Sequence, residues 1–180
     1  MKMTDEIHIE ASREQVFAAL NDPEILRKAI PGCQELDQTS ETELTATVQA
    51  KVGPVKATFR GAVTLSDINS PESYIISGEG KGGAAGFAKG KAKVSLAEDG
   101  SATILSYEVD AEVGGKLAQV GGRLIEGTSK KLAGDFFETF SGLVGSTKVA
   151  MEKPAATSEP ILLWVEAAIV AMILIVSFAA

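Results

Sequence analysis

One apolar stripe in residues 115–145 limits most strongly how this chain can fold. Its apolar side chains recur mostly three or four residues apart, which is the spacing of one face of an α-helix. The residues expected on that face are Leu117, Val120, Leu124, Leu132, Phe136, Phe140 and Leu143. The pattern predicts one long helix whose apolar face is covered by the rest of the chain.

Two glycines, Gly121 and Gly122, interrupt this predicted helix. A glycine in a helix interior costs roughly 1 kcal/mol relative to alanine. Two interpretations remain open. Either the backbone passes close to a strand or a ligand here, or the helix breaks.

The residues before the helix supply the surface that it covers. From residue 43 to residue 113, apolar and polar side chains alternate, which is typical of antiparallel strands with one buried face. A tight turn at residues 53–54 predicts a hairpin that pairs Val48 with Phe59. These strands form the sheet on which the helix packs.

A second hairpin is expected to turn at residues 98–101. With that turn, Lys91 would lie opposite Glu108 on the outer face. Lys89 would lie opposite Asp110. Such pairs contribute only tenths of a kcal/mol, so they would fix the register more than the stability.

The first thirty residues predict a strand over residues 4–10 and two short helices. Ser12 and Gln15 form a capping box at the start of the first helix. Asp22 before Pro23 marks the start of the second helix. The fold class is therefore α+β, with a curved antiparallel sheet around a long C-terminal helix.

Composition excludes several classes of function. A chain of 180 residues with 45% hydrophobic side chains has room for one domain with a core, residues 1–145, plus an appendage. The net charge of −7 argues against a nucleic-acid partner. One histidine and one cysteine leave no metal site and no catalytic set. The glycine-rich residues 78–83 match a nucleotide-binding spacing, but the alternation continues after them where that motif needs a helix.

Many inward-facing positions of the predicted sheet carry small side chains. Native interiors are closely packed, so such positions need either bulky partners or a bound apolar molecule. The predicted lining of a hydrophobic cavity is Ala46, Val48, Ala50, Ala57, Phe59, Gly61, Ala92, Leu105, Tyr107, Val109, Leu117, Val120 and Leu124. The alternative is a sheet that curls tightly around the helix and leaves no space.

The last 35 residues read as a linker and a membrane anchor. Residues 146–160 are rich in Pro, Ala, Thr and Ser, and residues 161–180 contain one charge, Glu166. Twenty helical residues reach roughly 30 Å, which is the hydrocarbon thickness of a bilayer. Trp164 and Glu166 are expected near the headgroup layer. A transmembrane anchor with the domain in the cytoplasm is predicted, and a helix lying in the membrane surface is the alternative.

Several short motifs in order resemble a known family. They are SREQVF at residues 12–17, DPE at 22–24, IPGC at 30–33, KVGPVK at 51–56, GKGG at 80–83 and FAKG at 87–90. Together they resemble the carbon monoxide dehydrogenase CoxG family, which belongs to the START-like, or SRPBCC, superfamily with its helix-grip fold. The resemblance covers about residues 2–145.

This resemblance implies a non-catalytic accessory protein without a covalent cofactor. Its partners would be the lipid of the cytoplasmic membrane, a molybdenum hydroxylase of the carbon monoxide dehydrogenase type, and a hydrophobic small molecule such as a respiratory quinone. The runner-up is a pure membrane-recruitment adaptor with a filled core and no ligand. An enzyme of the same fold would need an inward proton-transfer residue, for which only Tyr107 or Asp135 is available.

Overall fold

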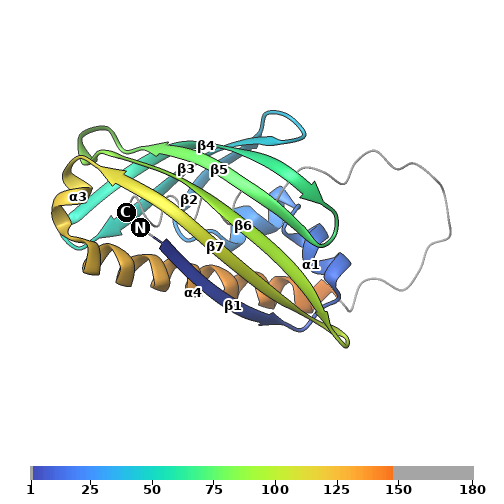
Figure 1. The fold of residues 1–180 in the computed structure, drawn as a ribbon. Coiled ribbons are helices and arrows are strands. Elements are labelled where there is room, and N and C mark those ends of the chain that lie inside the picture. The colour runs from blue at the N-terminus through green and yellow to red at the C-terminus, as the bar shows by residue number, and fades with distance from the viewer. Residues whose placement is uncertain (1, 148–180) are drawn as a thin grey trace.

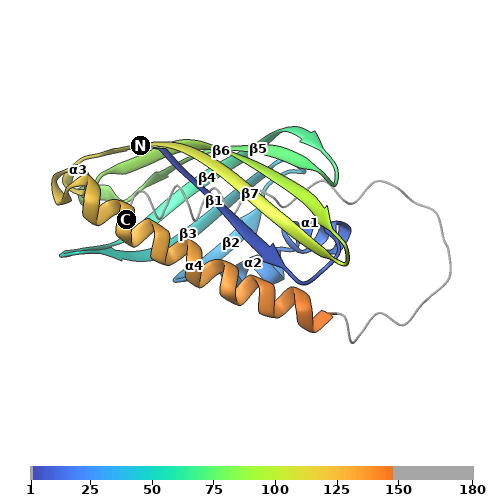
Figure 2. The ribbon, with the colours of Figure 1, turned by 60° about the horizontal axis from the view of Figure 1, so that its bottom comes forward.

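The computed structural model describes residues 2–147, which form one antiparallel sheet and five helical segments. In chain order they are β1 (Lys2–Ile9), α1 (Arg13–Ala19), α2 (Pro23–Ala29), β2 (Cys33–Gln38), β3 (Glu43–Val52), β4 (Val55–Asn69), β5 (Ser73–Lys81), the 3₁₀ turn η1 (Gly83–Ala85), β6 (Phe87–Asp99), β7 (Ala102–Gly114), α3 (Lys116–Val120) and α4 (Gly122–Thr147). Figure 1 shows the sheet arching over α4, and Figure 2 shows α4 running along the sheet. The α+β prediction is confirmed.

The seven strands lie in the order β1-β7-β6-β5-β4-β3-β2, and every neighbouring pair is antiparallel. Strands β2 to β7 therefore follow one another as a meander, and β1 closes on the outer edge of β7. The predicted first hairpin is confirmed, because Val48 pairs with Phe59. The turn at residues 53–54 sets this register.

The predicted register of the β6–β7 hairpin is wrong by two residues. Asp99 already pairs with Ala102, so the turn has two residues where four were predicted. As a result Lys91 faces Asp110 and Lys89 faces Glu112, with 3.3 Å between the Lys89 ammonium and the Glu112 carboxylate. A shift of two keeps each side chain on its predicted face of the sheet.

Two capped helices, α1 and α2, connect β1 to β2. The predicted capping box is confirmed: the Gln15 backbone N–H donates to the Ser12 hydroxyl, and the Ser12 N–H donates to the Gln15 side chain. The Asp22 carboxylate accepts from two backbone N–H groups of the first turn of α2. The caps fix where the two helices begin, and both helices contact α4 (Figure 2).

The predicted single C-terminal helix is broken into α3 and α4. Gly121 adopts φ +99°, a left-handed conformation that side chains with a Cβ rarely reach. No atom lies within 4 Å of where a Cβ would stand on Gly121 or Gly122, so crowding by a strand does not explain either glycine. Of the two interpretations, the helix break is the correct one.

The break changes which side chains of α4 are buried. Its buried face contains Ile125, Ser129, Ala133, Phe136, Phe137, Phe140 and Val144. Leu124, predicted on that face, is 45% exposed, and Leu132 is half-buried. The spacing predicts one continuous helix with one apolar stripe, whereas α4 begins at Gly122 and turns a different side toward the sheet.

The predicted linker and anchor lie outside the described residues. Within residues 2–147, no helix combines the length and the apolar character that crossing a membrane requires. The division of the chain into residues 1–145, 146–160 and 161–180 stays a prediction.

Candidate functional site

Small side chains gather on the inner face of the sheet toward its α3 end. The strand register sets Ala46, Gly61, Gly80 and Ala88 side by side across β3, β4, β5 and β6. A neighbouring row contains Gly78, Gly90 and Ala111. We call these seven residues and Ala92 the small-residue band. All eight are buried or half-buried.

An aromatic cluster lies in the part of the interior toward α1. Tyr107 of β7 stacks on Phe137 of α4 with 5.7 Å between ring centroids. Phe136 contacts both Phe137 and Phe140, at 5.0 and 5.5 Å between centroids. The interior therefore changes along its length from an aromatic cluster to the small-residue band.

The predicted cavity residues divide between these two halves. Ala46, Gly61 and Ala92 belong to the small-residue band, whereas Leu105 and Tyr107 pack in the aromatic half. Val48, Phe59, Val109 and Leu117 are buried, Ala50 is buried near the β3–β4 turn, and Ala57 is half-buried. Their role in ligand binding stays a prediction.

Val120 and Leu124, also predicted to line the cavity, cover the β3–β4 turn at the α3 end. A Cβ on Gly53 would lie 2.6 Å from a Leu124 methyl group and 3.6 Å from one of Val120. Because Val120 is half-buried and Leu124 is exposed, apolar side chains reach the surface here. This end is the candidate entrance to the interior.

The glycine-rich residues 78–83 serve the fold. They end β5 and lead into η1, with no long helix after them. A Cβ on Gly82 would lie 2.2 Å from the Phe59 ring, and one on Gly86 would lie 2.0 Å from the Gly114 carbonyl oxygen. These glycines let the η1 loop pack against Phe59 and the start of α3, so nucleotide binding is not supported.

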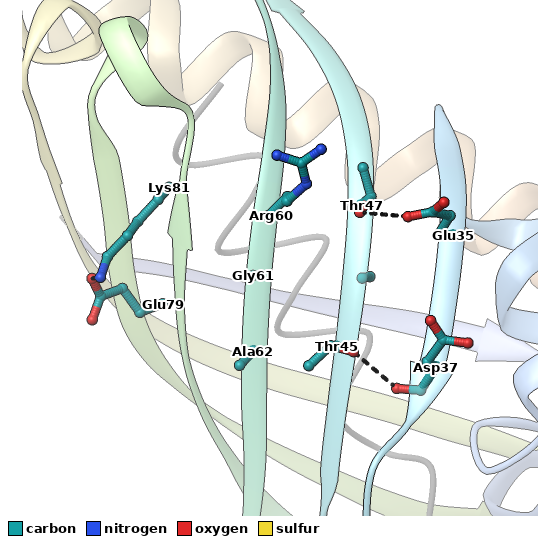
Figure 3. A pocket seen from close by; sticks show the side chains of 10 residues that line it. Glu35, Asp37, Thr45, Thr47, Arg60, Gly61, Ala62, Glu79 and Lys81 are labelled. Carbon is teal, nitrogen blue, oxygen red and sulfur yellow. Dashed lines mark hydrogen bonds and ion pairs between the residues drawn. The ribbon is translucent and has the colours of Figure 1, made fainter.

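A polar groove of about 510 Å³ lies on the outer face of the sheet, across β2, β3, β4 and β5 (Figure 3). The Thr47 hydroxyl donates to the Glu35 carboxylate at 3.2 Å, and Lys81 pairs with Glu79 at 3.2 Å. Arg60 lies between these two pairs in the view of Figure 3. Sequence reasoning missed the groove, because its polar residues alternate like any solvated face of a sheet.

The two residues considered for proton transfer, Tyr107 and Asp135, lie in different surroundings. Burial, the negative charge of Asp5 and a hydrogen bond with Asp5 raise the pKa of Tyr107, so its hydroxyl stays protonated. Asp135 lies on the surface of α4, 2.6 Å from the Lys131 ammonium, as expected for a local helical pair. Among residues 2–147, no three His, Cys, Asp or Glu side chains are grouped to hold a metal ion.

The fold places the protein in the START-like, or helix-grip, class. A START superfamily protein from Mycobacterium smegmatis is 18% identical, with a TM-score of 0.56 over 82% of this chain and 97% of that chain. The Zhui aromatase/cyclase from Streptomyces is 10% identical, with a TM-score of 0.63 over 86% of this chain and 99% of the other. At these identities the likeness shows the fold alone.

Residues 6–145 match the model of the CoxG family, which is described as the G subunit of carbon monoxide dehydrogenase. The chain belongs to this family. A conserved protein from Geobacillus kaustophilus, known from its crystal structure, is 31% identical with a TM-score of 0.77, over 82% of this chain and 97% of that one. A comparison with curated proteins finds no significant match. Family and fold together suggest a ligand-binding accessory protein.

Proposed function

We propose that this protein is a membrane-tethered accessory protein that recruits a molybdenum-containing enzyme of the carbon monoxide dehydrogenase type to the cytoplasmic membrane. The observation that carries the proposal is the match of residues 6–145 to the CoxG family. The apolar residues 161–180 support the tether, because they are long enough to span the hydrocarbon layer. The family match also supports the dehydrogenase as the partner.

We propose further that the domain binds a hydrophobic ligand, a respiratory quinone, between the small-residue band and the α3–α4 segment. The band is apolar, and Leu117 of α3 and Ile125 of α4 are buried with 0% and 2% exposure. Apolar pockets with few polar groups suit ligands of this kind. A quinone held there could accept two electrons and two protons from a docked dehydrogenase and carry them to the respiratory chain.

The competing function is a recruitment adaptor with a filled core. The stacked Tyr107, Phe136, Phe137 and Phe140 favour it, because their closely packed rings fill the interior between β7 and residues 136–140 of α4. The grooves found among residues 2–147 also lie on the outer face of the sheet and beside α1 and α2. Both functions share the tether, so tether and ligand need separate tests.

Removing residues 161–180 tests the tether and the recruitment. In cells that also make the dehydrogenase, we expect the shortened chain and the dehydrogenase activity to move from the membrane pellet to the soluble fraction. Membranes are washed at high salt, which screens weak charge contacts with lipid. A shortened chain that stays in the washed pellet would refute the tether. Dehydrogenase that stays there without it would refute the recruitment.

A further inference from the structure

Three segments far apart in the sequence meet at the α3 end of the domain. They are residues 51–57 at the β3–β4 turn, residues 82–87 around η1, and residues 113–125 through α3. Phe87 pairs with Gly114, which joins the second segment to the third. Gly53 lies under Leu124, which joins the first to the third. Figure 1 shows α3 at the end of the molecule opposite to α1.

The charge of this end is opposite to that of the whole chain. The three segments contain Lys51, Lys56, Lys116 and Arg123 and not one Asp or Glu, in a chain of net charge −7. All four cationic side chains are exposed, and none forms an ion pair with another described residue. The result is a cationic surface on an acidic protein.

Two of these lysines repel each other in the folded domain. Lys51 lies directly opposite Lys56 in the β3–β4 ladder. Like charges at such positions destabilise a sheet. The arrangement is therefore unfavourable for the domain alone and becomes favourable when an anionic surface lies against it.

The same three segments also carry an exposed apolar residue. Leu124 is the exposed large hydrophobic residue of the part of the chain that the structure describes. The half-buried Val120 lies beside Leu124 over Gly53, and the half-buried Val55 follows Gly53 by two residues. Apolar side chains ringed by Lys and Arg are typical of surfaces that dip into the boundary between headgroups and acyl chains of anionic membranes.

We propose that the α3 end is a docking surface for an anionic phospholipid bilayer. Leu124, Val120 and Val55 enter the headgroup layer, and Lys51, Lys56, Lys116 and Arg123 contact lipid phosphates. The contact needs no tail, so it goes beyond the proposed function. It also turns the candidate entrance toward the membrane in which an apolar ligand dissolves.

The predicted tether is long enough for this orientation. The tail leaves α4 at the end far from α3, and the 26 residues of α4 span about 39 Å. The 13 residues 148–160 reach at most about 43–47 Å when extended. A chain anchored through residues 161–180 can therefore lay its α3 end on the same bilayer. This step alone rests on the proposed function.

Vesicle sedimentation with residues 1–147 tests the surface without the tail. These residues contain the hydrophobic core of the described part of the chain, and the Geobacillus protein matches over 97% of its own length with a TM-score of 0.77. We expect binding to vesicles of phosphatidylcholine mixed with phosphatidylglycerol, and little binding to phosphatidylcholine alone. Equal binding to both, or to neither, overturns the proposal.

A charge-matched pair of variants locates the contact. Each basic side chain near an anionic leaflet strengthens binding about fivefold, so Lys51→Gln with Lys56→Gln is expected to weaken it about 25-fold. The control is Lys28→Gln with Lys93→Gln, which removes the same charge from exposed positions elsewhere and should leave binding unchanged. Equal losses in both variants would mean that only net charge matters and would refute this surface.

A tryptophan reporter tests insertion of the apolar side chains. The only tryptophan of the chain, Trp164, lies outside residues 1–147, so Leu124→Trp gives a single signal. We expect its fluorescence to shift to the blue with anionic vesicles, while Glu138→Trp on the exposed side of α4 shows no shift. A shift of Leu124→Trp with purified dehydrogenase but not with vesicles would assign the surface to a protein partner and overturn the lipid proposal.

The two proposals can fail separately. If full-length protein stays in salt-washed membranes and residues 1–147 do not bind anionic vesicles, the tether stands and the docking surface fails. If residues 1–147 bind vesicles and the full-length protein is lost in the salt wash, the docking surface stands and the tether fails.

Discussion

The only two tyrosines of the chain, Tyr74 and Tyr107, are both buried, and burial raises the pKa of each. Their hydroxyl groups differ in their partners. Asp5 lies directly opposite Tyr107 in the β1–β7 ladder and raises the pKa of its hydroxyl, whereas the Tyr74 hydroxyl has no hydrogen-bond partner among the described residues. The Tyr74 ring is held by an edge-on contact with Phe17, at 6.1 Å between centroids.

Replacing each tyrosine with phenylalanine should therefore have opposite effects. Tyr74→Phe removes an unpaired buried hydroxyl and should raise the free energy of unfolding by about 1 kcal/mol. Tyr107→Phe removes a hydroxyl that lies opposite the Asp5 carboxylate and should lower the free energy of unfolding by about 1 kcal/mol. Urea unfolding at neutral pH measures both. A loss in Tyr74→Phe as large as that in Tyr107→Phe would show that its hydroxyl is satisfied by a buried water.

At the residue scale, the sequence predicts which side of each strand is buried. Val48, Phe59 and Val109 are buried as the alternation indicates, because a strand has only two faces. Leu124 could not be placed in this way. Its exposure depends on the rotation of α4, which the left-handed Gly121 sets.

At the scale of the elements, the break between α3 and α4 requires a positive φ at only one of two adjacent glycines. Gly121 has φ +99°, while Gly122 is the first residue of α4 and has no positive φ. Neither has a neighbouring atom that a Cβ would meet. The two positions therefore differ in backbone conformation and not in crowding.

Alanine at these two positions should give a contrast. Gly121→Ala should lower the free energy of unfolding by about 1–2 kcal/mol, because a Cβ is strained in the left-handed region. Gly122→Ala should leave it unchanged or raise it by up to about 1 kcal/mol, because alanine favours the helix. Thermal and urea unfolding of both variants check this. Equal effects would mean that the break between α3 and α4 is not fixed by Gly121.

The elements themselves were largely predictable, and their connections were less so. The capping box at Ser12 and the turn at Gly53 act through neighbouring residues, so the sequence contains all of the signal. The β6–β7 register depends on whether Glu98 and Asp99 still pair, as they do with Thr103 and Ala102. Because Glu98 and Asp99 suit either a turn or a strand end, the residue types alone do not distinguish a turn of two residues from a turn of four.

At the scale of the whole molecule, the two ends of the domain differ in packing and charge. The α1 end contains the aromatic cluster, and the tail leaves from this end. The α3 end contains the small-residue band, the exposed Leu124 and four cations that form no ion pair within residues 2–147. The alternation within each strand predicts that small residues point inward. Only the register of β3 to β7 shows that these residues form one band.

The central claim is that an apolar ligand occupies the interior beside the small-residue band. Ala92 has 0% exposure and belongs to the band. In a filled core, Ala92→Leu would overpack and cost about 1–3 kcal/mol. In a ligand site, the added side chain would take the place of ligand and change the stability little.

The most direct measurement is the quinone that residues 1–147 keep in solution after quinone-loaded liposomes have been pelleted. We predict that the natural sequence retains quinone in proportion to protein, and that Ala92→Leu, with an unchanged free energy of unfolding, retains much less. No quinone in the supernatant at any protein concentration, together with an Ala92→Leu variant destabilised by overpacking, would contradict the account.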